Sequence, residues 1–535
     1  MRSCSIPLLC AAAGAGLLLA GCSENSILGG RSDADWATDT GYPGEADADY
    51  DGDEGTGAND DTQPPEQEDD FIALRPAQTD IYVFIANPTR GTVTRVNVFT
   101  QDVLTTDVGN DPQVVLTSPD YTTAVVFNRG DDSVTILDAD TLASFEVEVR
   151  DNFNNMVMSP NGNWVGLWHD RAAESPDDPP PTGVQSFNEA SFVHVPTGDH
   201  FPMAVGFNPR DIRFTPDSTL AVVVSDEFLA MVDLTVSVPS PTLVQVAEDL
   251  LDPPIAEEVA ITPSGAYAFV RQFGAEDLVV VDLSTHDVSR LPVGINPTDL
   301  DLTPDGTKAV VVSRGSGEVY VFDAANPFDT PDILALPEEA TLGSVVMAPS
   351  GDQAILYTTA VLEATYATWD LGTDEITLRS LVKPVAGIAV TPTGESLLVF
   401  HTKDDAVDAD PNSPFDNKWA LSLIDLDDFR SNPLLLPSEP IGYANALSGL
   451  RGYLIMENQQ WLSVLRYDTL LYDEYRLRSY PVHLGVLPDL DIADGDEPPA
   501  WVSQEHSLGR ISFFDPDDES METITGFELN SGIED

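Results

Sequence analysis

Hydrophobic residues in this chain come in short runs that turn residues separate at regular intervals. In the stretch DLTPDGTKAVVVSRGSGEVYVFD, residues 301–323, Thr303 to Gly306 form a turn signal, because Pro fixes φ and Asp and Gly tolerate a tight return. The runs Lys308 to Val312 and Glu318 to Phe322 are rich in β-branched and aromatic residues, which favour strands. Small polar residues from Ser313 to Gly317 separate the two runs. The stretch therefore predicts a turn followed by an antiparallel hairpin.

The same phrase of turn and strand recurs along the chain. Successive turn prolines lie 43, 41, 56, 47, 41, 45 and 43 residues apart. This spacing is typical of propeller blades and is too short for a βαβ unit with its helix and loops in every copy. Two fainter copies follow near Ser448-Gly449 and Asp494-Gly495. The eight clear copies have their turn proline at Pro76, Pro119, Pro160, Pro216, Pro263, Pro304, Pro349 and Pro392.

Each unit also ends in the same way, with a strand that closes on Asp, a turn and one more strand. Such strands end at Asp138, Asp282, Asp323 and Asp425. Four antiparallel strands per unit follow, so we predict an all-β β-propeller of about ten blades in a single ring. Phe71 to Leu74 would be the first inner strand and Met521 to Leu529 the last outer strand. Two rings, a ring of seven or eight blades with extra units, and a set of unrelated β-domains stay open as alternatives.

The repeated phrases resemble a known family. A strand, Gly-x-x-Pro, an apolar strand, Ser/Thr-Pro-Asp-Gly and strands ending in Asn and Asp are similar to the YVTN-type β-propeller repeat, itself WD-like. Phe84-Ile85-Ala86-Asn87 looks like its strand signature. The resemblance covers residues 71–535 and is strong in the first eight units. It implies a fold more firmly than a function, because such propellers include surface proteins, sugar-acid lactonases and subunits of redox enzymes.

The first residues have the layout of a secretory signal, with Arg2 followed by an apolar run that ends at Ala20. That run is too short for a comfortable membrane-spanning helix. Leu19-Ala20-Gly21-Cys22 resembles the bacterial lipobox, whose Cys is acylated after cleavage. We therefore expect residues 1–21 to be a lipoprotein signal and Cys22 to be lipidated, with an ordinary cleaved signal as the alternative. Ser23 after the Cys favours the outer membrane of the cell envelope, on its periplasmic or surface face.

Residues 22–70 are predicted to be an acidic, disordered tether. Residues 33–70 hold 15 Asp or Glu and no Lys or Arg, so the segment repels itself and has little apolar surface to bury. Asp47, Asp49, Asp51 and Gly52 match the opening of an EF-hand loop, but Ala58 stands where the twelfth-position Glu is needed. A solvated spacer is therefore favoured over weak Ca²⁺ binding. Cys4 and Cys10 lie in the removed segment, so the mature chain can form no internal disulfide.

The repeat region, residues 71–535, is also strongly acidic. Sixteen of the 90 acidic and two of the 24 basic residues precede it, which leaves 74 acids, 22 bases and a net charge near −52. Nucleic acids and anionic lipid surfaces need Lys or Arg to neutralise their phosphates. The charge therefore argues against a nucleic-acid partner and leaves only the N-terminal lipid as a membrane contact. Adaptation to high salt would produce the same composition.

The loops between second and third strands are expected to surround the channel mouth together with the blade-to-blade junctions. By resemblance, this face is the one that propellers commonly use for ligands. The loops carry a mixed set of polar residues, so a metal held by equivalent positions around the axis is not expected. For each His the alternative is a loop residue bonded to the backbone. The candidate binding residues are Asn87, Asn128, His169, Asp226, Arg271, Arg314, His401, Asn458 and His506.

Two long insertions extend such loops, residues 170–191 in the third unit and 402–418 in the eighth. Insertions gathered on one face are typical of the binding face of a repeat protein. Long surface loops are, however, also tolerated at little thermodynamic cost. The second insertion is rich in Asp, and Asp408 and Asp410 are its candidates for weak Ca²⁺ binding. No other cofactor is predicted.

No local enzyme motif is present in the sequence. It has no CxxCH, HExxH, Gly-x-Ser-x-Gly or phosphate-loop pattern. We therefore expect an exported, lipid-anchored propeller that acts as a non-catalytic binding protein on an envelope protein or glycan. The alternative is a lactonase-like hydrolase or lyase acting at the channel mouth through the three candidate His and the two candidate Arg residues. A structural envelope component without a small ligand is a third possibility.

Overall fold

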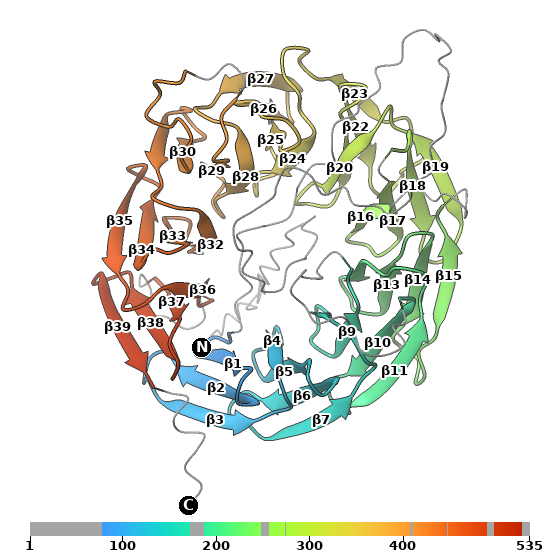
Figure 1. Cartoon of the computed structure of the whole chain (residues 1–535). Helices are drawn as coiled ribbons and strands as arrows, with labels where there is room; N and C mark the ends of the chain where they lie inside the picture. The colour runs from blue at the N-terminus through green and yellow to red at the C-terminus, as the bar shows by residue number, and fades with distance from the viewer. Residues whose placement is uncertain are drawn as a thin grey trace, which may run out of the picture.

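The computed structural model describes residues 78–171, 187–247, 256–272, 274–406, 410–446, 448–488 and 497–526. Over these residues the chain forms 39 strands in ten sheets, and each sheet is made of sequential antiparallel strands. The sheets stand side by side around a single ring (Figure 1). The fold is therefore a ten-bladed β-propeller, as predicted, and the two-ring and smaller-ring alternatives are wrong.

Nine blades have four described strands and the first has three. Blades 1 to 5 contain β1 (Tyr82–Asn87), β2 (Thr92–Asn97), β3 (Val103–Asp107); β4 (Pro112–Thr117), β5 (Thr123–Asn128), β6 (Ser133–Asp138), β7 (Ser144–Glu148); β8 (Asn155–Met158), β9 (Trp164–Trp168), β10 (Glu189–His194), β11 (Asp199–Ala204); β12 (Asp211–Phe214), β13 (Leu220–Val224), β14 (Phe228–Asp233), β15 (Pro241–Gln245); β16 (Ala256–Ile261), β17 (Tyr267–Gln272), β18 (Asp277–Asp282) and β19 (Val288–Pro292). Blades 6 to 10 contain β20 (Pro297–Leu302), β21 (Lys308–Ser313), β22 (Glu318–Asp323), β23 (Asp332–Ala335); β24 (Ser344–Met347), β25 (Gln353–Tyr357), β26 (Thr365–Asp370), β27 (Glu375–Ser380); β28 (Val385–Val390), β29 (Ser396–His401), β30 (Ala420–Asp425), β31 (Ser431–Leu435); β32 (Pro440–Asn445), β33 (Arg451–Met456), β34 (Trp461–Arg466), β35 (Leu471–Arg476); β36 (Pro481–Val486), β37 (Ala500–Gln504), β38 (Arg510–Asp515) and β39 (Ser520–Thr525).

The predicted hairpin of blade 6 is present as β21 and β22, and Gly306 N donates to Thr303 O at 2.6 Å to close the preceding turn. The last outer strand β39 ends at Thr525 rather than at Leu529, and residues 527–529 lie outside the described part. The predicted first inner strand, Phe71 to Leu74, also lies outside it. Six inner strands start with the same β-bulge, as between Pro297 and Asp299 in β20.

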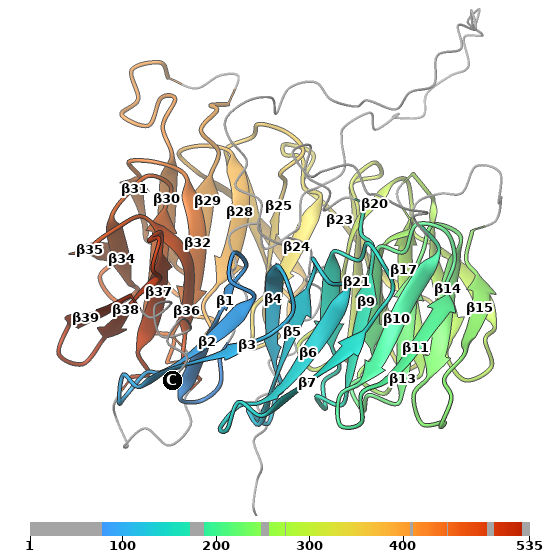
Figure 2. The same ribbon diagram turned by 60° about the horizontal axis from the view of Figure 1, so that its bottom comes forward.

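The ring has two faces, which the strand order separates. The turn face carries the hairpins between first and second strands, such as Thr303 to Gly306, and those between third and fourth strands. The junction face carries the second-to-third loops and the blade-to-blade connections. In Figure 2 the junction face points up, and the loop between β29 and β30 rises above its surroundings. Both predicted insertions belong to this face, since they connect β9 to β10 and β29 to β30. The first was predicted to end at residue 191, but β10 already begins at Glu189, so the insertion ends at residue 188.

In the described part of the chain the core consists of ten hydrophobic clusters, and each cluster joins two neighbouring blades. The cluster between blades 4 and 5 has thirteen buried members, among them Val224 and Val270. The cluster that closes the ring, between blades 10 and 1, has seven, among them Val83 and Trp501. Burial of each such side chain contributes about 1.5–3 kcal/mol. The seam that closes the ring, between blades 10 and 1, therefore has a smaller apolar core than the seam between blades 4 and 5. Polar contacts supplement this smaller core.

Gln78 supplies these contacts at the closing seam. Its Nε2 donates to Val486 O, and its Oε1 accepts from Trp501 Nε1. Its carbonyl accepts from Thr117 Oγ1 at 2.5 Å, and its backbone bridges to Val83. One residue thus connects blades 10, 1 and 2.

The repeated Pro and Gly of the turn face pack against each other from blade to blade. A Cβ added to Gly306 would lie 2.0 Å from Cγ of Pro263 in the preceding blade. Gly162 faces Pro119 in the same way, while Gly265 and Gly449 face the Thr residues of the preceding turns. Gly306 also has φ +64°, which disfavours a side chain. The phrase recurs because each turn is the packing surface for the next one.

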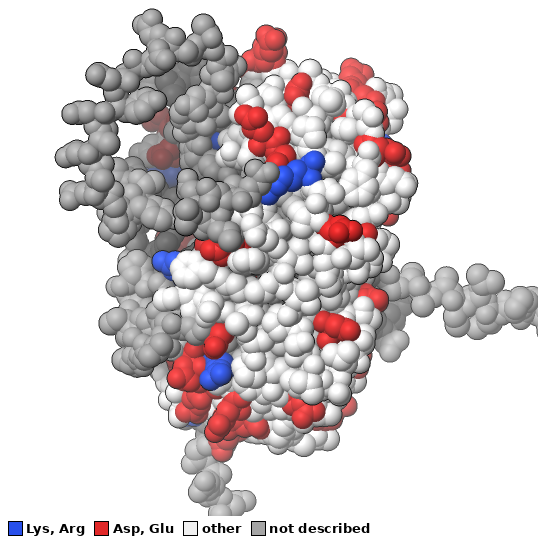
Figure 3. Space-filling model, turned by 90° about the vertical axis from the view of Figure 1, so that its right-hand side faces the viewer, with Lys and Arg blue, Asp and Glu red and all other residues white. Residues whose placement is uncertain are grey.

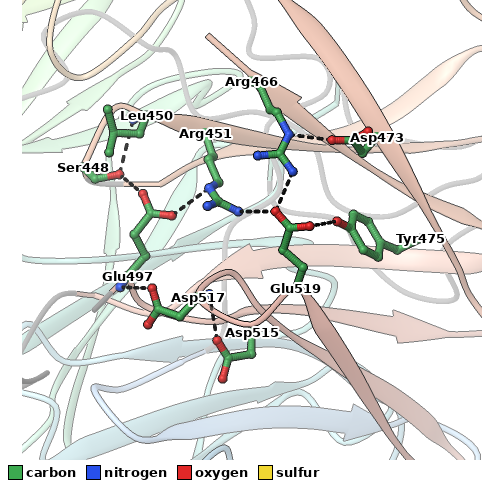
Figure 4. Close-up of polar contacts among 10 residues, drawn as sticks. All are labelled: Ser448, Leu450, Arg451, Arg466, Asp473, Tyr475, Glu497, Asp515, Asp517 and Glu519. Carbon is green, nitrogen blue, oxygen red and sulfur yellow. Dashed lines mark hydrogen bonds and ion pairs between the residues drawn. The ribbon is translucent and has the colours of Figure 1, made fainter. Parts of the chain in front are cut away.

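Blades 9 and 10, whose turns are the faintest in the sequence, are joined by an ion-pair network on the turn face (Figure 4). Arg451 Nε lies 3.0 Å from Glu497 Oε2. Arg466 Nη2 lies 2.6 Å from Glu519 Oε1, and Tyr475 donates to Glu519 Oε2 at 3.0 Å. The Arg466 guanidinium holds the pKa of Glu519 below its usual range. Blade 9 supplies both arginines and blade 10 both glutamates, so the network braces this seam.

Candidate functional site

Four of the predicted binding residues occupy equivalent buried positions at or just after the end of a second strand: Asn87, Asn128, His169 and His401. Asn128 Nδ2 donates to Ser133 Oγ at 3.1 Å and to Thr135 Oγ1 at 2.9 Å, on the adjacent third strand. Asn87 donates to Thr92 and Thr94 in the same pattern. These amides hold second strands to third strands within a blade.

The two histidines connect their strand ends to blade junctions. His169 Nδ1 donates to Asn152 O at 2.7 Å, and its ring packs against Phe187. His401 Nδ1 donates to Pro384 O at 3.2 Å, so Nε2 accepts from Ser422 Oγ at 2.7 Å. Burial lowers the pKa of His401 to about 4, which keeps the ring neutral at pH 7. Both rings bond to backbone carbonyls, as the alternative interpretation of the histidines expected.

The sequence prediction did not include the other residues at the equivalent position of the second strand, which we call the strand-end register. The residue nine positions after each turn proline is polar in seven consecutive blades, and a count from the prolines would have found it. Ser313, for example, donates from Oγ to Val293 O, again at a blade junction. In blade 10 the equivalent Gln504 accepts from Arg478 N and Ser479 N, both at 3.0 Å. The seven residues are Asn128, His169, Ser225, Gln272, Ser313, Thr358 and His401.

The other predicted residues lie one or two positions away from this register. Asp226 accepts from Arg210 Nε at 2.8 Å and from Asn208. Arg314 is buried, and Asn458 is exposed with φ +54°. His506 Nδ1 accepts from Leu508 N at 3.2 Å. The nine candidates come from nine different blades, and their part in binding stays a prediction.

The remaining candidate, Arg271, directly precedes Gln272. It belongs to a group of charged residues at the inner edge of blades 4 to 6. Its Nε lies 3.0 Å from Glu258 Oε2, which also accepts from Leu300 N of blade 6 at 3.0 Å. Burial raises the pKa of Glu258, and Arg271 opposes that shift. We call this group the inner-edge cluster; it consists of Asp211, Arg213, Glu258, Arg271, Asp299 and Asp301.

The insertion of blade 8 is organised by a buried lysine that sequence reasoning did not find. Lys383 lies in the junction before β28, and its side chain is fully buried. Its ammonium donates to Lys403 O at 2.9 Å, to Phe415 O at 3.1 Å and to the Asp405 carboxylate. Asp405 also accepts from Asn417 N at 2.6 Å. Both ends of loop 402–418 are therefore fixed to one ammonium group on the junction face. We call Lys383 and these three contacts the Lys383 cage.

Among the Asp residues of this insertion, Asp405 is thus paired with Lys383. Asp410 accepts from Asn412 N at 2.9 Å within its own turn, and Asp408 lies outside the described residues, as does the EF-hand-like stretch of the tether. Across the described parts of the chain, no group of three or more His, Cys, Asp or Glu side chains could hold a metal ion. In the same parts, no helix is long and apolar enough to cross a membrane.

One side of the rim shows the acidic balance of the surface. On the side that carries β15 and β19, Asp and Glu side chains are scattered among uncharged ones, and Lys and Arg occur singly (Figure 3). Most of the polar contacts described above lie within the blades, on the junction face and at the brace between blades 9 and 10.

No protein-family model matches this sequence, and no curated protein matches it either. Solved structures do match. A structure titled as that of the eukaryotic initiation factor is 12% identical, with 75% of this chain and 97% of that chain covered and a TM-score of 0.49. The dihydro-heme d1 dehydrogenase NirN is 13% identical with 78% of each chain covered and a TM-score of 0.43, and AztD from Citrobacter koseri is 13% identical with 58% and 86% covered and a TM-score of 0.35. At these identities the likeness concerns the fold alone.

Proposed function

We propose that this chain is a non-catalytic binding protein that presents the junction face of a rigid ring to an envelope protein or glycan. The observation that carries the proposal is the Lys383 cage, which fixes loop 402–418 above that face. A loop that served only as a tolerated insertion would need no buried ammonium to order it, whereas a binding loop gains affinity from being ordered before its partner arrives.

The histidines and asparagines of the junction face favour binding over catalysis. His401 is buried, neutral at pH 7 and bonded through both ring nitrogens. A general base must reach the proton that it removes. His169 is buried as well, and its Nδ1 donates to the Asn152 carbonyl. The scaffold therefore supports loop presentation better than proton transfer at the channel mouth.

We further propose that the ring belongs to the YVTN-type repeat proteins and reaches the cell envelope as a lipoprotein. The basis is the repeated phrase and the Leu19-Ala20-Gly21-Cys22 motif. Replacing Cys22 by alanine is expected to block processing or to move the protein from the membrane to the soluble fraction, because the acyl chains would be its only anchor. Fractionation of the native host checks this, with Cys10→Ala, inside the signal, as the control. Unchanged membrane association of Cys22→Ala would contradict the lipid anchor.

The binding face is tested by removing its insertions. Shortening residues 170–188 and 402–418 to tight turns, with Lys383→Met added so that no buried ammonium is left alone, is expected to abolish partner capture from a native envelope extract. The melting transition should stay nearly unchanged, because each loop is held by its own blade. Quantitative capture and thermal melting of the soluble ring measure the two effects.

A matched control is a shortened third-to-fourth hairpin of blade 6, residues 324–331, on the turn face. That variant should keep full capture. If the double-loop variant captures its partner as well as the parent ring does, the binding site is elsewhere. If it melts at a much lower temperature, the loops brace the fold and the capture result must be read on the single-loop variants.

A further inference from the structure

Two carboxylates are buried in the seam between blades 6 and 7. Asp299 and Asp301 stand two residues apart on β20, so both side chains point to the same side of the strand. Leu300 and Leu302, which alternate with them, pack toward blade 5. Asp299 accepts from Val345 N on β24, which shows that this side of β20 faces blade 7. Asp299 is 4% exposed and Asp301 is 7% exposed.

The surroundings of Asp301 are apolar. Val310 and Val312 of β21 and Val345 of β24 belong to the hydrophobic cluster of this seam, and Met347 packs against it. No hydrogen bond or ion pair to the Asp301 carboxylate is found among the described residues. A buried carboxylate without a hydrogen-bond donor or a cation partner strongly favours its neutral form.

For Asp301, the neighbouring charges act in the same direction as burial. Burial, followed by the Asp299 carboxylate and then Glu258 on β16, raises the pKa of Asp301 well above its usual value. Burial and Glu258 raise the pKa of Asp299, while Arg271 on β17 opposes the shift. Arg213 on β12 acts on Glu258. β24 brings no titratable side chain, and Lys308 on β21 is exposed at the turn face.

We infer that Asp299 and Asp301 form a proton-binding pair that keeps the inner ends of blades 6 and 7 together. With one proton on the pair, Asp299 accepts from Val345 N as a carboxylate while Asp301 stays neutral among the valines. When the proton leaves to bulk water, two like charges share an apolar seam, and β20 separates more readily from β24. The seam is then a pH-sensitive element of the ring, and this holds whichever partner the junction face binds.

The direction of the pH effect follows from the linkage between proton binding and folding. The pair binds a proton more tightly in the folded ring than in the unfolded chain, so its contribution to stability is complete below the unfolded carboxyl pKa. That contribution is lost as pH rises through the folded pKa. The seam should be closed at acidic pH and should open more often as pH rises toward neutral and beyond. Over the window of proton release, the opening equilibrium changes by up to tenfold per pH unit for one proton.

Hydrogen exchange of the β20 and β24 peptides from pH 5 to pH 8.5 tests this in the soluble ring. After correction for intrinsic exchange, the parent ring should show opening that increases by up to tenfold per pH unit. Asp301→Asn and Asp301→Leu should show slower exchange at high pH and no such dependence. The Asp301→Asn ring should also lack the infrared carbonyl band of a protonated buried carboxyl that the parent ring shows.

The matched control is Asp305→Asn in the same blade. The Thr303 hydroxyl and Thr307 hold the pKa of Asp305 below its usual range, so this change should leave the pH dependence of the seam intact. The inference is overturned if both Asp301 variants exchange like the parent ring at every pH, or if the parent ring has no protonated-carboxyl band. Since the infrared test uses the parent ring, it decides even if a variant fails to fold.

Discussion

Gly306→Ala is expected to destabilise the ring by roughly 2–5 kcal/mol. About 1–2 kcal/mol comes from placing a side chain at φ +64°, and about 1–3 kcal/mol comes from overpacking against Pro263. The proline ring cannot swing away from the added Cβ, which would lie 2.0 Å from its Cγ. Chemical denaturation, or the thermal midpoint where unfolding is irreversible, measures the loss.

Gly317→Ala is the control for this change. Gly317 lies in the same blade and has the same φ of +64°, but a Cβ there meets nothing within 4 Å. It should therefore show only the backbone part, about 1–2 kcal/mol. The difference between the two variants reports the contact between successive turns. Equal losses would mean that the turns do not support one another and that the repeated Gly serves only its own hairpin.

Lys383→Met is expected to disorder loop 402–418 and to lower stability by about 3–5 kcal/mol, the cost of breaking a buried ion pair from one side. Met fills a similar volume but leaves the Asp405 carboxylate and two carbonyls without their donor. Asp405 remains partly exposed, so water can reach it, and the lower end of the range is expected. Thermal melting gives the stability, and limited proteolysis or hydrogen exchange across the loop gives its order.

Lys403→Met is the matched control, because Lys403 lies in the same loop with an exposed side chain and contributes only its carbonyl to the cage. It should melt like the parent ring. The double variant Lys383→Met with Asp405→Asn should recover part of the loss, since no unpaired carboxylate is left. If Lys383→Met leaves both loop protection and partner capture unchanged, the cage does not organise a binding surface.

The fold could be predicted closely because its signals are local. Thr303 to Gly306 determine a turn by the φ preferences of four successive residues, and the β-branched run within Lys308 to Val312 favours a strand. Because these signals repeat at the spacing of propeller blades, few architectures other than a propeller are compatible with the sequence. The blade number also followed, since even the faint copy near Ser448 keeps its Gly449 against Thr393 of the preceding turn.

The candidate site was predicted less well because its contacts join residues far apart in the chain. Asn128 and His401 were named from their loops, but the same reasoning chose Asp226 and Arg314 instead of Ser225 and Ser313, one residue earlier. The choice thus differs by one residue from the polar positions at the ends of the second strands, and the part of either set in binding stays a prediction. The nine-residue interval from the turn proline identifies those polar positions.

The amino-acid sequence by itself determined the blades, their number and the faces on which their loops lie, because turn and strand preferences act over a few neighbouring residues. Only the tertiary structure decided which polar groups meet. Lys383 finds Asp405 and Phe415 across 22 and 32 residues, and Gln78 meets Trp501 across 423. From the sequence alone, Asp301 would be taken for an ordinary charged residue. It becomes a buried carboxyl only when blade 7 covers it. Burial and hydrogen bonding across seams depend on ring closure, which no local pattern encodes.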